Sequence, residues 1–132
     1  ELTSLIITGA AEDLVNKGGL AELVLGWELV KYGSSRIRHD LFYWENVGEG
    51  TTSEVDYIVA HQMKVLPIEC KAGTSGKMKS LRLFMRNKHI SHAIRCSLEN
   101  FSQLVFQDEK ESGESKYIRI CPLYAVSSIA NL

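Results

Sequence analysis

The chain of 132 residues has the length of one domain, because domains usually contain about 100–200 residues. Its 45% apolar and 23% charged residues are typical of a globular protein and exclude a disordered or collagen-like chain. No apolar run approaches the ~20 residues of a membrane-spanning helix, so we expect no membrane partner. The chain begins Glu1-Leu2-Thr3-Ser4, without an initiator methionine or a signal segment. We therefore interpret residues 1–132 as a single domain cut from a longer protein.

The net charge of -1 conceals an uneven distribution. The segment 71–98 contains no acidic residue and has seven basic ones: Lys71, Lys77, Lys79, Arg82, Arg86, Lys88 and Arg95. Such a block can supply phosphate contacts, or it can be the solvated face of a helix. The three cysteines are widely spaced and form no CxxC pair, which argues against a disulfide framework or a zinc ribbon. We expect an intracellular, cytoplasmic protein with reduced thiols.

Apolar periodicity and the positions of glycine and proline predict the elements in chain order. Helices are predicted over 10–17 and 20–32, strands over 41–45, 54–60 and 64–72, a helix over 79–88, strands over 92–98 and 117–121, and a last helix from 122 to about 129. Loops are predicted over 46–53, 72–76 and 108–116. The order of helix, three strands, helix and strand predicts an α/β sandwich, with flanking helices around a mixed central sheet.

Two predictions concern the core. The apolar positions of the 20–32 helix nearly surround its axis, so we expect this helix to be buried. In the 79–88 helix, the side chains Leu81, Phe84 and Met85 should face inward. The aromatic residues Trp27, Tyr43 and Trp44 could stack on nucleic-acid bases, but we favour core packing for all three.

Charged residues interrupt two of the predicted strands. Asp56 lies in the run Val55–Val59, and Glu69 and Lys71 are two residues apart, so their side chains leave one face of their strand. If the hairpin turns on His61-Gln62, Asp56 pairs with Pro67 and lies diagonal to Glu69 on the same face. Two carboxylates and one ammonium group would then converge.

This trio suits hydrolysis assisted by a divalent metal. Mg²⁺ prefers carboxylate oxygens and waters, and it often uses only one or two protein carboxylates. A metal polarises a phosphoryl oxygen and acidifies a water, and a nearby lysine can orient that water. The alternative from spacing alone is a salt bridge on an exposed hairpin face.

Glu22 adds a carboxylate to the apolar 20–32 helix, which is costly unless it meets a cation. Its alternative interpretation is a favourable charge near a helix N-terminus. Taken together, these residues resemble the PD-(D/E)XK nuclease superfamily. The match is closest to a domain of unknown function found at the C-terminus of many bacterial and archaeal AAA-type ATPases. The similar stretches are Lys17–Glu22, Glu28-Leu29, Phe42–Trp44, Glu54–Tyr57, Pro67–Lys71, Ser80-Leu81, Phe84 and Ile120–Tyr124.

The resemblance implies a restriction-endonuclease-like fold and a missing N-terminal ATPase domain. It also implies that Asp56 and Glu69 are ligands of Mg²⁺ or Mn²⁺, that Lys71 is the catalytic lysine, and that Glu22 is an auxiliary acid. Cys70 would be a core residue. On this interpretation the domain hydrolyses nucleic acid, most naturally DNA. We expect Lys79, Arg82 and Arg86 of the 79–88 helix to face its phosphates.

The alternative function is a catalytically silent module that binds nucleic acid or regulates the ATPase, because a fold does not guarantee an activity. Two other motifs in the sequence give little support for a functional site. Residues 73–77 resemble a P-loop, but Met78 stands where a serine or threonine must hold Mg²⁺, so we expect no ATP site. His89 and His92 are three apart, but Ile90-Ser91 indicates that the helix has already ended.

Overall fold

The computed structural model describes residues 17–32, 41–48, 51–72, 78–108 and 113–131. Apart from its last residue, the predicted 10–17 helix lies outside these ranges, as does most of the predicted 72–76 loop. Within the described part of the chain, no helix combines the length and the apolar character needed to cross a bilayer.

The described elements follow the predicted order of helix, three strands, helix and strand, with two further strands and a short helix after them. They are α2 (Lys17–Tyr32), β1 (Phe42–Gly48), β2 (Thr51–His61), β3 (Lys64–Cys70), α3 (Lys79–Asn87), β4 (His92–Ser97), β5 (Ser102–Gln107), β6 (Ser115–Pro122) and the 3-10 helix η1 (Leu123–Asn131). The domain is therefore a mixed α/β structure.

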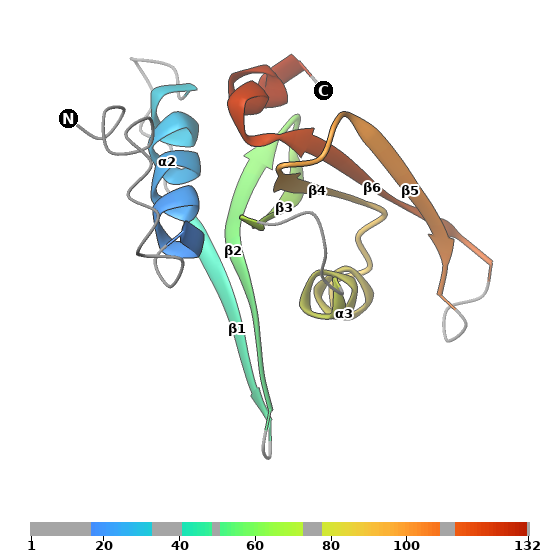
Figure 1. Cartoon of the computed structure of the whole chain (residues 1–132). Coiled ribbons are helices and arrows are strands. Elements are labelled where there is room, and N and C mark those ends of the chain that lie inside the picture. The colour runs from blue at the N-terminus through green and yellow to red at the C-terminus, as the bar shows by residue number, and fades with distance from the viewer. Residues whose placement is uncertain (1–16, 33–40, 49–50, 73–77, 109–112, 132) are drawn as a thin grey trace.

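The strands form one six-stranded sheet in the order β1-β2-β3-β4-β6-β5. The central pairs β3–β4 and β4–β6 are parallel, while the outer pairs are antiparallel. In Figure 1, α2 and η1 lie on one side of the sheet, and α3 lies on the other. The helix α3 connects β3 to its parallel neighbour β4, as expected for a crossover between parallel strands.

Each face of the sheet has its own apolar core. Under α2 and η1 the buried side chains are Leu25, Ile68, Cys70, Ile94, Cys96, Cys121, Val126 and Ile129. Under α3 they are Val55, Leu81, Phe84, Met85, Ala93 and Ile118. The predicted inward face of the 79–88 helix is confirmed, because Leu81, Phe84 and Met85 are all buried.

Two predictions about the elements are wrong. The predicted 46–53 loop is the end of a long hairpin, since β1 continues to Gly48 and β2 begins at Thr51; this hairpin projects from the body of the domain (Figure 1). The strand β5 was not predicted, and β6 begins inside the predicted 108–116 loop. The predicted last helix is present, although it has 3-10 geometry and begins at Leu123, after Pro122 has ended β6.

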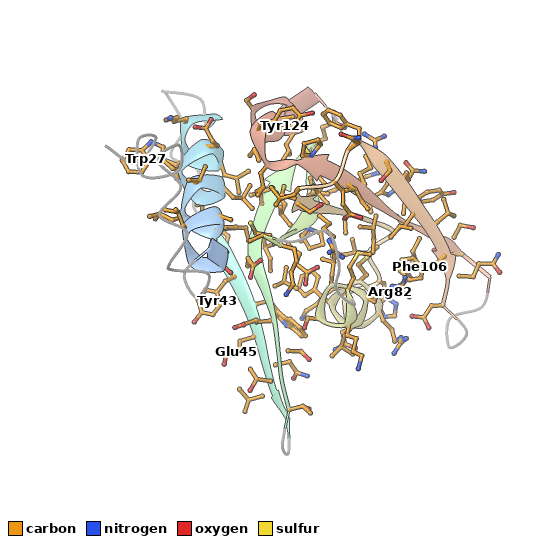
Figure 2. All side chains as sticks on the ribbon, viewed as in Figure 1. Trp27, Tyr43, Glu45, Arg82, Phe106 and Tyr124 are labelled. Carbon is orange, nitrogen blue, oxygen red and sulfur yellow. The ribbon has the colours of Figure 1, made fainter. Side chains whose placement is uncertain are left out.

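The prediction that α2 is buried on all sides is also wrong. Leu25 is fully buried, whereas Leu23, Trp27 and Val30 are each more than half exposed. Figure 2 shows Trp27 on the side of α2 that faces away from the sheet. Of the three aromatics assigned to the core, only Trp44 packs there, with its ring edge-on to Phe84 at a centroid distance of 5.2 Å.

A tyrosine of β2 packs directly on the backbone of α2. The Tyr57 hydroxyl donates a hydrogen bond of 2.8 Å to the Glu22 carbonyl, and its ring covers Gly26. A Cβ atom at Gly26 would overlap the phenol ring and its hydroxyl oxygen. Glycine at this position therefore sets the distance between α2 and the sheet.

Replacing this glycine should loosen the contact. We expect Gly26→Ala to lower the free energy of unfolding by roughly 1–3 kcal/mol, as is usual for overpacking in a filled core. The matched control is Gly18→Ala in the same helix, where a Cβ would meet nothing within 4 Å. Urea unfolding followed by circular dichroism measures both variants. Equal stabilities for the two variants would show that the Tyr57 ring moves aside at no cost.

Candidate functional site

A bulge in β2 places Asp56 at the point where β2 and β3 stop pairing. Trp44 of β1 pairs with Val55, but Phe42, two residues earlier, pairs with Ile58, so β2 carries one extra residue there. The pairing of β2 with β3 ends at Tyr57, opposite Ile68. Beyond it, the Asp56 carboxylate accepts a hydrogen bond of 2.6 Å from the backbone N–H of Cys70. The Asp56 side chain thus takes the place of a backbone carbonyl as the acceptor for this N–H group.

The observed register corrects the predicted hairpin. Ile58 pairs with Pro67, and His61 pairs with Lys64, so the register differs by two residues from the predicted pairing of Asp56 with Pro67. Continued by one residue, the observed register brings Asp56 level with Glu69. A shift of two residues keeps each side chain on its face, whereas a shift of one would have separated these two carboxylates.

Lys71 follows β3 directly, and its side chain is exposed. Its backbone N–H donates a hydrogen bond of 2.8 Å to the Cys96 carbonyl, which fastens the end of β3 to β4. The Lys71 charge acts on the carboxyl groups of Glu22, Asp56 and Glu69, and it lowers the pKa of each. The ammonium group and these three carboxylates therefore share one region of the molecule.

The carboxylates in this region outnumber the cations that act on them. Burial is the largest cause that raises the pKa of Glu22, Asp56 and Glu69 above the ordinary carboxyl values. The charge of Asp56 raises the pKa of both Glu22 and Glu69 further. The hydrogen bond from Cys70 and the charge of Lys71 lower the pKa of Asp56 without reversing the shift. An added cation would relieve this repulsion.

Two charged residues near the site were not predicted to belong to it. Glu54 is exposed, and its charge raises the pKa of Glu22 and of Asp56. Its position two residues before Asp56 was an available signal. Arg95 pairs with Glu69 in the β3–β4 register, is 2% exposed, and lowers the pKa of Glu69. An arginine within the apolar strand His92–Ser97 was the signal for it.

The donor set suits a hard divalent cation. Asp56 and Glu69 offer carboxylate oxygens at the end of the β2–β3 pairing, and Mg²⁺ typically takes one or two such ligands and completes its shell with water. Among the residues that the structure describes, no group of three or more histidine, cysteine or acidic side chains is placed to hold a metal ion. The candidate site therefore consists of the carboxylates of Asp56 and Glu69, with Glu22 close enough for the charge of Asp56 to raise its pKa.

The cysteines do not form a nucleophilic site. Cys70 is 6% exposed, and burial together with the neighbouring carboxylates raises the pKa of its thiol to about 12. Cys96 and Cys121 are fully buried, and contact between them raises the pKa of Cys96. Because the thiolate is the reactive form, the raised pKa values make Cys70 and Cys96 poor nucleophiles, and the core assignment of Cys70 is confirmed.

The predicted basic face of α3 is largely engaged within the domain. The Arg86 Nε atom forms an ion pair of 2.6 Å with the buried carboxylate of Asp108. The Arg82 guanidinium lies 4.5 Å from the centre of the Phe106 ring, and Figure 2 shows the two side chains facing each other. Lys79 is exposed. Two of the three predicted phosphate contacts thus also hold α3 against β5 and the residue that follows it.

The fold and site define a mixed α/β domain with an acidic cluster at the end of its central strands. Residues 17–125 match the family model described as "Domain of unknown function (DUF4143)", and this match covers most of the chain. The chain belongs to this family. Searches of the curated proteins and of the solved structures found no match.

The raised carboxyl pKa values make stability depend on pH. A carboxyl group whose pKa is higher in the folded state binds more protons there, so its contribution to stability falls as the pH rises from its ordinary value through the raised one. We expect Asp56→Asn to reduce this fall, because asparagine carries no charge yet can still accept the Cys70 hydrogen bond.

Urea unfolding in the presence of a chelator tests this expectation, over a pH series that begins near the ordinary aspartate value of 3.8. The control variant is Glu45→Gln, which removes an exposed carboxylate of β1. An identical pH slope in the wild type and Asp56→Asn would contradict the raised pKa of Asp56.

Proposed function

We propose that this domain is a nuclease-like hydrolase of the PD-(D/E)XK type, which cleaves phosphodiester bonds of nucleic acid with Mg²⁺ or Mn²⁺. The observation that carries the proposal is the meeting of Asp56, Glu69 and Lys71 at the end of the β2–β3 pairing. Their order in the sequence is the one that the PD-(D/E)XK resemblance requires. We also propose that the domain is attached to an AAA-type ATPase, and that DNA is its nucleic acid.

In this mechanism each of the four residues has a separate role. Asp56 and Glu69 would hold the divalent cation. A cation bound there would polarise a phosphoryl oxygen and lower the pKa of a bound water. The exposed Lys71 ammonium would orient the attacking water and stabilise the charge that develops on the phosphate. Glu22, held over β2 by the hydrogen bond from Tyr57 to its backbone, would act as the auxiliary acid.

A second candidate function is a silent regulatory or interaction module of the ATPase. The observation that favours it is the outer face of α2, where Leu23, Trp27 and Val30 follow helical spacing and are each more than half exposed. Such a face suits a docking partner and requires no metal. The two candidates differ in whether the acidic site binds a divalent cation.

Calorimetric titration with Mn²⁺ separates these candidates without a choice of substrate. We expect one saturable site in the wild type and a loss of affinity of at least about tenfold in Asp56→Asn, because one of two carboxylate ligands is removed. Glu45→Gln is the matched control for the loss of one exposed negative charge that is not a proposed ligand. The absence of Mn²⁺ binding in the wild type would favour the silent module.

The lysine is tested by its effect on rate. We expect Lys71→Met to lower the Mg²⁺-dependent cleavage of DNA by about 10²–10³-fold, the usual cost of losing one group that stabilises the transition state. Mn²⁺ affinity should be retained, because Lys71 is not a ligand. The control is Lys64→Met, which removes an exposed lysine at the opposite end of β3. Equal cleavage by Lys71→Met and the wild type would remove Lys71 from the mechanism.

A further inference from the structure

The side of the sheet that faces α2 and η1 is only partly covered by the described helices. Alternation along β4 and β6 places His92, Tyr117 and Arg119 on the same face as Cys96 and Cys121 of the α2/η1 core. Further along the strands from that core, however, His92 is exposed, and Tyr117 and Arg119 are half-buried. A stretch of the sheet face is thus accessible at the amino-terminal halves of β4 and β6.

The edge strand β5 extends this accessible stretch. Val105 pairs with Tyr117, and Gln103 pairs with Arg119, so both side chains lie on the same face. Val105 is 57% exposed, and Gln103 is also exposed. We call the surface formed by His92, Tyr117, Arg119, Gln103 and Val105 the sheet platform.

The sheet platform combines stacked rings with a cation. The His92 and Tyr117 rings are stacked with a centroid distance of 5.2 Å and an interplanar angle of 17°. Arg119 lies two residues beyond Tyr117 on β6, about 7 Å along the strand. The five platform residues include one cation, Arg119, and no acidic side chain, a composition that suits an anionic partner.

Flat rings beside a guanidinium group suit a ligand that carries both planar faces and phosphates. A nucleobase could continue the His92–Tyr117 stack, while Arg119 meets a neighbouring phosphate. In a duplex the faces of the bases are already stacked, so only an unpaired strand can use such a surface. Val105 and Gln103 add an apolar contact and an amide within the same patch.

We propose that the sheet platform binds single-stranded nucleic acid. The proposal goes beyond the hydrolysis assigned to Asp56, Glu69 and Lys71, and it shares with that function only the class of partner. It predicts a preference for single strands over duplexes, with an affinity that falls as salt rises because Arg119 contacts phosphate.

Two adjacent residues of β5 provide a matched test. Val105→Glu adds a carboxylate to the sheet platform, whereas Leu104→Glu adds the same charge on the α3 face, where Leu104 pairs with Ile118 and is 37% exposed. The probe is a fluorescently labelled, mixed-sequence single-stranded DNA, measured by fluorescence anisotropy in low salt with a chelator. A duplex of the same sequence is the comparison.

We expect the wild type to bind the single strand more tightly than the duplex. Val105→Glu should weaken binding about tenfold or more, since stacking and a phosphate contact are both disturbed, and Leu104→Glu should change it less than twofold. If circular dichroism shows that Val105→Glu does not fold, Gln103→Glu on the same face takes its place.

Three results would overturn the proposal: no binding by the wild type, tighter binding of the duplex, or equal weakening by the two glutamate variants. A wild-type dimer that Val105→Glu dissociates, without binding of the single strand, would instead assign the platform to a second copy of the chain. Mn²⁺ titration of the same samples reports on the hydrolase separately. An absence of metal binding would contradict the hydrolase but not the sheet platform. An absence of single-stranded DNA binding would contradict the sheet platform but not the metal site.

Discussion

The hydrogen bond between the Asp56 carboxylate and the Cys70 N–H is the contact on which the arrangement of the domain depends. It lies where β2 and β3 separate, and it satisfies a backbone donor that the bulge in β2 would otherwise leave unpaired. The bulge also changes the alternation of side chains, so that Val55 packs under α3 while Tyr57 packs under α2. One extra residue therefore lets β2 contribute side chains to both cores, with Asp56 between Val55 and Tyr57.

This arrangement gathers negative charge that the domain only partly neutralises. The pKa values of Glu22, Asp56 and Glu69 are raised mainly by burial, while Lys71 opposes the shift in all three and Arg95 opposes it in Glu69. A site kept purely for stability would be expected to pair its buried carboxylates more completely. Local rules are usually broken where a ligand completes the structure, which is the physical reason for our interest in a divalent cation here.

The periodicity of apolar residues in the sequence predicts most of the helices and strands and the central residues of the site. The prediction fails where this periodicity is weak. The two-residue repeat put Glu69 and Lys71 on one face, and an error of two in the register left that face unchanged. The described residues 46–48, 51 and 52 are exposed and pack against no core, so their polar sequence suggested a loop. In β5 the apolar residues Leu104, Val105 and Phe106 are consecutive, which hides a strand at the edge of the sheet. The exposed face of α2 was missed because its apolar residues surround the axis.

Charge counts along a sequence also cannot distinguish a cation that faces solvent from one that holds the fold. The block 71–98 has seven basic residues and no acidic one, yet Arg86 reaches beyond the block to Asp108, and Arg82 lies over Phe106. Both partners come from the region of β5, a strand that was not predicted, so their effect on α3 could not be anticipated. Meanwhile Arg119, which lies outside the block, stands beside the stacked rings of His92 and Tyr117. The sheet topology, more than the distribution of charge along the chain, decides which basic residues pack against other elements of the domain.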